Sequence, residues 1–529
     1  SGRPAIVRDH TVSTPYRWEP LAIDLAGLAG ETVALALELE AETEGVLGFW
    51  GAPALRSRRA AEPGRPRGVI LVQMDTLRRD HLDAYGHRRP TAPHLARLAA
   101  EGVLFRNTFA QAPWTKVSTP SILTSLYPST HGVRGFNDRL PAGATTVAEA
   151  FRDAGYATLS LSSVIFTGQY TNLHQGFEEL HEAGSLANRG GPLSAKTARE
   201  QVDRLLDWIE RRDGSPFFAF LHVFDPHFPY EPYQPYDTLW VSPERRAEHV
   251  RQRDQASQRI TDEFMRVRQL PSRDEVAASG FDPEAYVTVE TDWYDASIRA
   301  MDVEIGRLVE RLRAAGLGEQ VLLVLTSDHG TEFYEHGGMW HGHSLYGELT
   351  DVPLIAHWPG RVAAGRAIEE VVQTIDVMPT LLELAGLPRP EAVQGQSLAP
   401  FLDPAARPAP DGAWAGWRRR PAFAERFPYA PDLPPPRDRT SYALIDGEWK
   451  LIEHRTPGAP PYELFDWRRD PLNRSDLAAR HPEVVARLGK TLAAWRRHVE
   501  AARLPADSQS ATSLSPEELE RLRSLGYIR

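Results

Sequence analysis

Two unbroken apolar runs, each ending on an aspartate, are the strongest feature of the hydropathy pattern. Residues 321–330 read VLLVLTSDHG, and residues 69–75 read VILVQMD. Runs of this kind predict buried strands of a parallel sheet. Because functional groups gather at the carboxyl ends of such strands, we expect Asp75, Asp328 and His329 to lie together if the strands are neighbours. Two carboxylates and an imidazole predict a divalent metal site, although either aspartate alone is more typical of a turn or helix cap.

Strand and helix patterns alternate through the middle of the chain. Apolar residues at helical spacing predict helices at 91–102, 146–155, 197–212, 290–316 and 376–388, and apolar runs predict further buried strands at 216–224 and 352–360. This alternation predicts an α/β fold with a mixed, mostly parallel central sheet flanked by helices. We place this main domain at residues 67–395.

The two ends of the chain differ from the middle in their pattern of apolar and polar residues. Residues 1–62 show strand-like alternation and no helical period, which predicts a small N-terminal β-segment. Residues 396–529 predict a C-terminal α+β subdomain, with a hairpin at 441–454, a strand at 462–467 and an amphipathic helix at 482–504. Residues 515–529 carry a helix-start signature, Ser515 followed by Glu518.

Composition excludes several classes of function. The 529 residues include 60 lysines and arginines against 71 acidic residues, a net charge of −11, so no basic field predicts nucleic-acid binding. The chain has no cysteine, which excludes disulfides, thiolate metal sites and cysteine nucleophiles. No apolar run is long enough to form a transmembrane helix. The chain begins with Ser1, which is compatible with a removed signal peptide, and an exported (periplasmic or extracellular) location is favoured over a cytoplasmic one; a homo-oligomer is compatible with the sequence.

Four motifs carry a resemblance to a known family. They are MDTLRRDHLDAYG (74–86), APWTKVSTPSILTSLYPSTHGV (112–133), DPHFPYEP (225–232) and TSDHGTEFYEHGGMWHGHSLYGELTDVPLI (326–355), with GEWKLIEH (447–454) near the end. In this order they resemble the sulfatase-like branch of the alkaline phosphatase superfamily, over residues 68–490. The resemblance implies the alkaline-phosphatase-like fold and a small anionic ester as substrate.

The nucleophile position departs from the sulfatase pattern. Sulfatases carry a cysteine or serine there, in C/S-x-P-x-R, that matures to formylglycine. Aligned without a gap, this position falls on Thr115, and threonine is the nucleophile in the phosphodiesterase, pyrophosphatase and phosphoethanolamine-transferase branches that the chain also resembles. A second register places Ser118 there and keeps a proline, but it requires a deletion of three residues. We prefer Thr115, which could also simply cap the following helix.

The implied metal ligands also differ from those of sulfatases. Thr76 stands where sulfatases have a second aspartate, and His329 follows Asp328. With Thr115 as a further ligand, this set favours Zn, Mn or Fe over Ca. We expect one tight metal site. Asp225 is a candidate for a second metal.

Asn107 and Lys116 are close to Thr115 in the sequence. Either could bind a second metal or a phosphoryl oxygen, although a surface role is more typical of a lysine such as Lys116.

Histidines are expected to supply the remaining chemistry. The resemblance implies that His227 and His341 contact the substrate oxygens and protonate the leaving group, which an imidazole can do near neutral pH. The other histidines of the motifs are interpreted as ordinary solvated loop residues: His81, His87, His131, His222, His336 and His343.

These expectations combine into one functional prediction. The chain is predicted to be a metal-dependent hydrolase of phosphate or phosphonate esters, with Thr115 as nucleophile and a phosphothreonyl intermediate. If an alcohol replaces water in the second step, the same site is a phosphotransferase. Two alternatives are a sulfatase with a formylglycine derived from Ser118, and a non-catalytic sulfatase-like protein that binds an anionic partner.

Overall fold

The computed structural model describes residues 64–182, 196–212, 214–428, 439–455 and 460–507, with scattered positions between 9 and 40. The chain forms two compact units, Ser1–Arg58 and Arg59–Arg529. In the first unit, the described positions contain one short 3-10 helix, η1 (Ala26–Leu28). Most of the predicted N-terminal β-segment, and all of the predicted helix at 515–529, lie outside the described residues.

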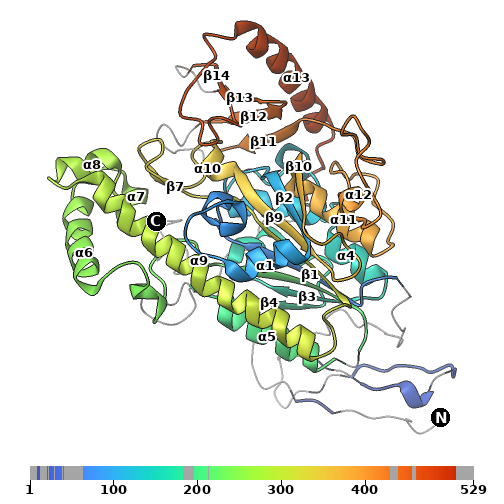
Figure 1. The fold of residues 1–529 in the computed structure, drawn as a ribbon. Helices are drawn as coiled ribbons and strands as arrows, with labels where there is room; N and C mark the ends of the chain where they lie inside the picture. The colour runs from blue at the N-terminus through green and yellow to red at the C-terminus, as the bar shows by residue number, and fades with distance from the viewer. Residues whose placement is uncertain are drawn as a thin grey trace. The chain divides into compact units, whose positions relative to one another are not determined.

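The second unit is built on an eight-stranded sheet (Figure 1). Its order is β10-β2-β9-β6-β1-β5-β3-β4. β9 runs antiparallel to both of its neighbours, and all other pairs in the sheet are parallel. The strands are β1 (Gly68–Met74), β2 (Val103–Phe109), β3 (Ala157–Leu161), β4 (Glu179–His181), β5 (Phe217–Val223), β6 (Val321–Ser327), β9 (Asp351–His357) and β10 (Arg366–Gln373). The predicted mixed, mostly parallel sheet is confirmed.

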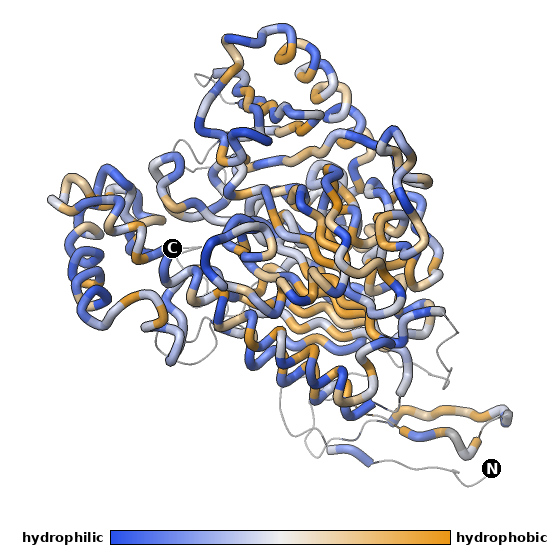
Figure 2. Tube along the Cα trace, viewed as in Figure 1, coloured by the Kyte–Doolittle hydropathy of each residue, from blue (hydrophilic) through white to orange (hydrophobic). Residues whose placement is uncertain are grey.

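Helices cover both faces of this sheet, which explains why its central strands are apolar throughout. In β1, Ile70 and Val72 face one core, whereas Val69 and Leu71 face the other. The first core is covered by α1 (Pro93–Glu101), α5 (Ala198–Glu210) and α9 (Pro283–Ala314). The second is covered by α2 (Thr115–Thr124), α4 (Val147–Asp153), α11 (Val377–Leu384) and α12 (Ala399–Leu402). Figure 2 shows the central strands as the most hydrophobic part of the fold.

Between β5 and α9 the chain leaves this alternating pattern. A helical excursion, which we define as residues 243–278, contains α6 (Pro243–Ser257), α7 (Glu263–Val267) and α8 (Arg273–Ala278). It lies beside the amino-terminal part of α9 (Figure 1), and α6 is strongly hydrophilic (Figure 2). The loop after β6 forms a small hairpin of β7 (Glu332–Phe333) and β8 (Met339–Trp340), followed by α10 (Gly347–Thr350).

The C-terminal residues form a smaller α+β layer, as predicted. Four antiparallel strands occur in chain order, and a long helix packs against them. They are β11 (Ala422–Arg426), β12 (Ser441–Asp446), β13 (Trp449–His454), β14 (Tyr462–Asp466) and α13 (Pro482–Ala501). Among the described residues, none of the helices combines the length and the apolar character needed to cross a bilayer.

Candidate active site

Two strand ends bring the predicted metal ligands together. β1 and β6 are parallel neighbours, with Met74 opposite Ser327, so Asp75 and Asp328 leave the sheet at the same edge. His329 Nε2 lies 3.7 Å from Asp75 Oδ1 and 3.5 Å from Asp328 Oδ2. The three side chains are at most 1% exposed. The structure therefore gathers two carboxylates and an imidazole in one buried cluster.

Thr115 lies beside this cluster and comes from the start of a helix instead of the end of a strand. It is the first residue of α2, and its Oγ1 lies 3.1 Å from His329 Nε2 and 3.5 Å from Asp75 Oδ2. The Nδ1–H of His329 donates to the carbonyl of Gly330 at 2.8 Å, which directs the other ring nitrogen towards Thr115. Because unpaired backbone N–H groups point out of a helix N-terminus, this position also suits an anionic oxygen.

His222 also belongs to the cluster, and the sequence reasoning missed it. It lies in β5, which pairs with β1, and its Nε2 is 3.4 Å from Asp75 Oδ2. Ligand atoms of Asp75, His222 and Asp328 lie within 4.8 Å of one another. The expectation of a solvated loop residue is wrong because His222 is fully buried in the sheet. A histidine inside a strand that reaches the same sheet edge was the available signal.

Several buried polar atoms of the cluster have no hydrogen-bond partner among the described residues. They are Asp75 Oδ1, Asp328 Oδ2 and both ring nitrogens of His222. Burial, and then the charge of Asp328, raise the pKa of Asp75 well above its usual value. Burial lowers the pKa of His222 to about 4. Buried acceptor atoms without partners are costly, and a cation between them would satisfy these atoms.

His227 and His341 lie beside the cluster. The ring of His341 is 4.5 Å from that of His329 and 5.1 Å from that of His227, between centroids. The Nδ1–H of His227 donates to the carbonyl of Phe228 at 2.6 Å, which leaves Nε2 as the nitrogen available to a substrate. Burial lowers the pKa of both imidazoles well below the usual value. The structure therefore places both rings beside the candidate metal ligands; their role toward a substrate stays a prediction.

A lysine that the sequence reasoning did not consider lies on the same side. Lys196 precedes α5, and its Nζ donates to the carbonyl of His227 at 3.0 Å. Burial lowers the pKa of Lys196 to about 8, although the negative charges of Asp225, Asp75 and Glu231 act to raise it. No motif identified this residue, because it lies in a stretch without periodicity.

Asp225 has a clear structural contact. Its Oδ2 accepts hydrogen bonds from the backbone N–H groups of Thr197 and Ala198, at 2.7 and 3.0 Å, and so caps the start of α5. Its Oδ1 has no hydrogen-bond partner among the described residues. Burial raises the pKa of this carboxyl. Asp225 therefore holds the segment that carries Lys196.

The two other candidates close to Thr115 in the sequence make contacts away from the cluster. Asn107 donates to the carbonyl of Glu369 in β10 at 2.8 Å and accepts from Arg79 at 3.2 Å. Both the nitrogen and the oxygen of its side-chain amide are therefore already hydrogen-bonded. The surface role expected for Lys116 is wrong, because the side chain is fully buried. Its Nζ donates to Thr171 at 3.0 Å and lies 4.1 Å from the ring centroid of Tyr170.

Ser118, the alternative nucleophile, is one turn further along α2 than Thr115. Its hydroxyl donates to the backbone carbonyl of Asp328 at 2.8 Å, and the side chain is fully buried. Ser118 thus holds the end of β6 in contact with α2. Asp75 Oδ2 and His329 Nε2 lie near the hydroxyl of Thr115 instead.

The other histidines make local contacts. His81 and His87 each bind one oxygen of Asp295, at 2.6 and 3.1 Å, and Arg89 binds the same carboxylate at 2.9 Å. This group is a second arrangement with metal-ligand spacing, but the guanidinium already neutralises the carboxylate.

For His131 the expectation of a solvated residue is wrong. It is fully buried against Ser121, at 3.0 Å, and burial lowers its pKa to about 3. His336 contacts the carbonyl of Leu472, and His343 contacts Glu332.

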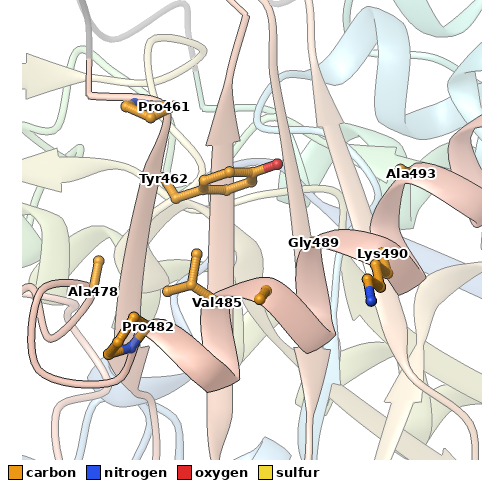
Figure 3. A pocket seen from close by; sticks show the side chains of 9 residues that line it. Pro461, Tyr462, Ala478, Pro482, Val485, Gly489, Lys490 and Ala493 are labelled. Carbon is orange, nitrogen blue, oxygen red and sulfur yellow. The ribbon is translucent and has the colours of Figure 1, made fainter.

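A cavity of about 600 Å³ lies away from this chemistry, between β14 and α13 (Figure 3). Its lining is mostly apolar and includes Tyr462, Val485 and Gly489. It contains none of the side chains of the candidate site. We therefore assign it no part in catalysis.

Comparison with known proteins agrees with this geometry. The sulfatase family matches residues 67–387, and the C-terminal region of N-sulphoglucosamine sulphohydrolase matches residues 335–498. Iduronate 2-sulfatase of Mus musculus is 26% identical, over 61% of this chain and 69% of its own length. Arylsulfatase K of Danio rerio is 25% identical, over 80% of this chain and 82% of its own.

Solved structures share the fold. A phosphonate monoester hydrolase of Silicibacter pomeroyi superposes with a TM-score of 0.64 at 22% identity, covering 85% of this chain and 98% of its own. This chain belongs to the sulfatase family, within the alkaline phosphatase-like superfamily.

Proposed function

We propose that this protein is a metal-dependent hydrolase of phosphate or phosphonate esters that uses Thr115 as its nucleophile. One observation carries the proposal: the Thr115 hydroxyl lies 3.1 Å from His329 and 3.5 Å from Asp75 at the start of a helix. The chain has no cysteine that could replace it. A hydroxyl held among metal-ligand side chains is the arrangement that an activated alcohol nucleophile requires.

The donor set fits a divalent cation. Asp75, Asp328, His329 and His222 supply oxygen and nitrogen atoms from adjacent strand ends, and several of these atoms lack hydrogen-bond partners. This mixture favours Zn, Mn or Fe over Ca. A cation bound there would act as a Lewis acid, lowering the pKa of the nucleophile and polarising the ester.

The protein side chains then have separate tasks. Thr115 attacks phosphorus in line and forms a phosphothreonyl ester as the bond from phosphorus to the leaving oxygen breaks. The proton of the Thr115 hydroxyl passes to Asp75 Oδ2, 3.5 Å away, and the leaving oxygen takes a proton from the imidazolium form of His227 or His341. Lys196 offsets negative charge on the phosphoryl oxygens, since its ammonium lies beside His227. Water next attacks phosphorus and gives a proton back to that imidazole, while the released Thr115 oxygen takes its proton back from Asp75; an alcohol in place of water would make the enzyme a phosphotransferase.

The second candidate function is a sulfatase, and the comparisons favour it specifically. The relatives compared above are named iduronate 2-sulfatase and arylsulfatase K. In this case Ser118, converted to formylglycine, would be the nucleophile, or Thr115 would attack sulfur. Conversion of Ser118 would break its hydrogen bond to Asp328, so α2 would have to adjust.

One experiment separates these functions. The purified full chain is loaded with Zn, Mn or Ca and assayed on bis(4-nitrophenyl) phosphate, 4-nitrophenyl phenylphosphonate and 4-nitrophenyl sulfate. A chelator-treated sample and the variants Thr115→Ala and Ser118→Ala are measured in parallel. We expect phosphate or phosphonate ester turnover that needs metal and Thr115.

Mass spectrometry supplies an independent readout. An intact mass that matches the encoded sequence supports Thr115, whereas the loss of two hydrogens at Ser118 identifies formylglycine. Rapid quenching during turnover should trap a phosphoryl group on Thr115. Turnover of the sulfate ester alone would replace the proposed function by the sulfatase, and no metal binding at all would favour a non-catalytic binding protein.

A further inference from the structure

A second group of metal-ligating side chains joins α9 to the loop between β1 and α1, which we define as residues 75–92 and call the β1–α1 loop. His81 Nδ1 lies 2.6 Å from Asp295 Oδ1, and His87 Nε2 lies 3.1 Å from Asp295 Oδ2. One ligand atom from each residue lies within 4.8 Å of the other two. Asp295 is 3% exposed, whereas the two histidines are 14% and 21% exposed. The group is therefore anchored in the fold and open to solvent through its imidazoles.

The spacing of this group is close to that of a tetrahedral metal site. Zinc–ligand bonds of ~2.1 Å place neighbouring ligand atoms ~3.4 Å apart. The two distances at Asp295 would therefore have to lengthen by less than ~1 Å. Burial acts to raise the pKa of Asp295, but hydrogen bonds from His81 and His87 hold it well below its usual value. The carboxylate is thus ionised, and a cation would take the place of the protons that now join it to the imidazoles.

α9 holds the β1–α1 loop at an earlier point as well. The hydroxyl of Tyr294 donates to the carbonyl of Thr76 at 2.7 Å and accepts from the backbone N–H of Arg78 at 2.9 Å. The next residue of the helix, Asp295, contacts the later part of the loop through both histidines. A cation bound at Asp295 would strengthen a junction that the fold already makes.

Arg89 is a competitor for the same carboxylate. Its Nη1 lies 2.9 Å from Asp295 Oδ2 and 2.7 Å from Asp292 Oδ1. Its guanidinium carbon also lies 5.3 Å from the ring centroid of Trp240. Arg89 therefore keeps Asp292 and Trp240 as partners when a cation binds Asp295. Its positive charge lowers the affinity for that cation but does not occupy the imidazoles.

We infer that His81, His87 and Asp295 form a second divalent-cation site, best matched by Zn²⁺, which fastens the β1–α1 loop to α9. Zinc binds two imidazoles and one carboxylate in a tetrahedral arrangement with the fourth position left to water. Calcium and magnesium prefer oxygen ligands throughout, so the two nitrogens disfavour them. The site contains none of the residues assigned to ester hydrolysis, so it stands independently of the proposed function.

Zinc titration of the full chain against a chromophoric chelator tests this site. Asp328→Asn removes a candidate ligand of the other cluster, so the zinc that this variant still binds reports on the second site. We expect it to bind one zinc ion, and the addition of His87→Gln to weaken that binding at least ~100-fold. His454→Gln is the matched control, since His454 also contacts a carboxylate, that of Glu463 at 3.1 Å, and it should leave zinc binding unchanged. Equal zinc affinity with and without His87→Gln would overturn the inference.

Arg89→Met gives an expectation of opposite sign. Removal of the competing charge should tighten zinc binding in the Asp328→Asn background by ~10-fold. Loss of a residue that merely supports the fold would not raise the affinity. Unchanged or weaker zinc binding in Arg89→Met would contradict a cation at Asp295.

Chemical labelling of the wild-type protein needs no substitution. Diethyl pyrocarbonate modifies neutral histidines, and peptide mass spectrometry locates the modified residues. We expect zinc to protect His81 and His87, whereas His454 should react equally with and without zinc. Modification of both residues at saturating zinc would overturn the inference. Because labelling requires no turnover, its result is the same whether or not the protein cleaves any ester.

Discussion

The hydroxyl oxygen of Thr115 lies 3.1 Å from Nε2 of His329, although 214 residues separate them in the chain. β6 delivers the histidine and α2 delivers the threonine, so the contact joins the end of a strand to the start of a helix. This relationship makes the identity of the nucleophile testable by substitutions that preserve shape.

Thr115→Val removes the hydroxyl and keeps the branched side chain. We expect kcat/KM to fall by roughly 1,000-fold or more, because within the described ranges Thr115 supplies the hydroxyl that contacts both His329 Nε2 and Asp75 Oδ2. Steady-state kinetics on the best ester, with circular dichroism to verify folding, measures this. Ser118→Ala is the comparison: it loses one hydrogen bond to Asp328 and should cost about 1 kcal/mol of stability. Loss of activity in Ser118→Ala, with activity retained in Thr115→Val, would reverse the assignment.

His222→Gln tests the candidate metal ligand that the sequence reasoning missed. The imidazole is 3.4 Å from Asp75, so we expect metal affinity to fall by about 10- to 100-fold. Competition with a chromophoric chelator measures the affinity. His357→Gln is a matched control, since His357 is a buried histidine in another strand of the same sheet. Equal affinity in both variants would show that His222 is not a ligand.

Lys196→Met removes a cation and keeps most of the apolar length. We expect kcat/KM to fall by about 100-fold, because the ammonium no longer offsets charge on the transferred group. Lys490→Met, on the exposed face of α13, should have wild-type kinetics. An unchanged kcat/KM in Lys196→Met would restrict Lys196 to holding the backbone of His227.

The buried carboxyl of Glu425, which accepts hydrogen bonds from Ser129, predicts a pH dependence of stability. Burial raises the pKa of Glu425 to about 7 from an ordinary value of 4.5, although hydrogen bonds from Ser129 oppose the shift. Between these values the folded state binds more protons than the unfolded state, so the free energy of unfolding falls as pH rises. The loss is up to about 3 kcal/mol.

Urea unfolding between pH 4.5 and 7.5 checks this prediction. Glu425→Gln can accept from the N–H of Ser129 and donate to its hydroxyl, but it cannot ionise. The variant should lose less stability than the wild type across the window. Parallel curves for the two proteins would contradict the raised pKa.

Hydropathy predicted the fold well because the central strands are buried on both faces. β1, β5, β6 and β9 are continuous apolar runs, and each was predicted within a few residues. The helical excursion was not predicted, because α6 is polar on most of its surface and shows weak periodicity. β10 was also missed, since only three of the eight residues of this edge strand are buried and they form no continuous apolar run.

Part of the candidate site could be predicted from the sequence for a related reason. Asp75, Asp328 and His329 lie directly after apolar runs, so the sequence predicts their position at the carboxyl ends of strands. His222 lies inside such a run, at 216–224, but was interpreted as a solvated loop residue. Lys196 belongs to a segment without periodicity, and only the folded chain brings it to His227.

The hydroxyl beside Asp75 and His329 belongs to Thr115, an ordinary encoded residue, and this has a consequence for how the protein is produced. A nucleophile that the gene encodes directly is complete when the chain has folded, whereas a formylglycine depends on a converting enzyme. We expect equal specific activity from expression hosts with and without that enzyme, once metal is supplied.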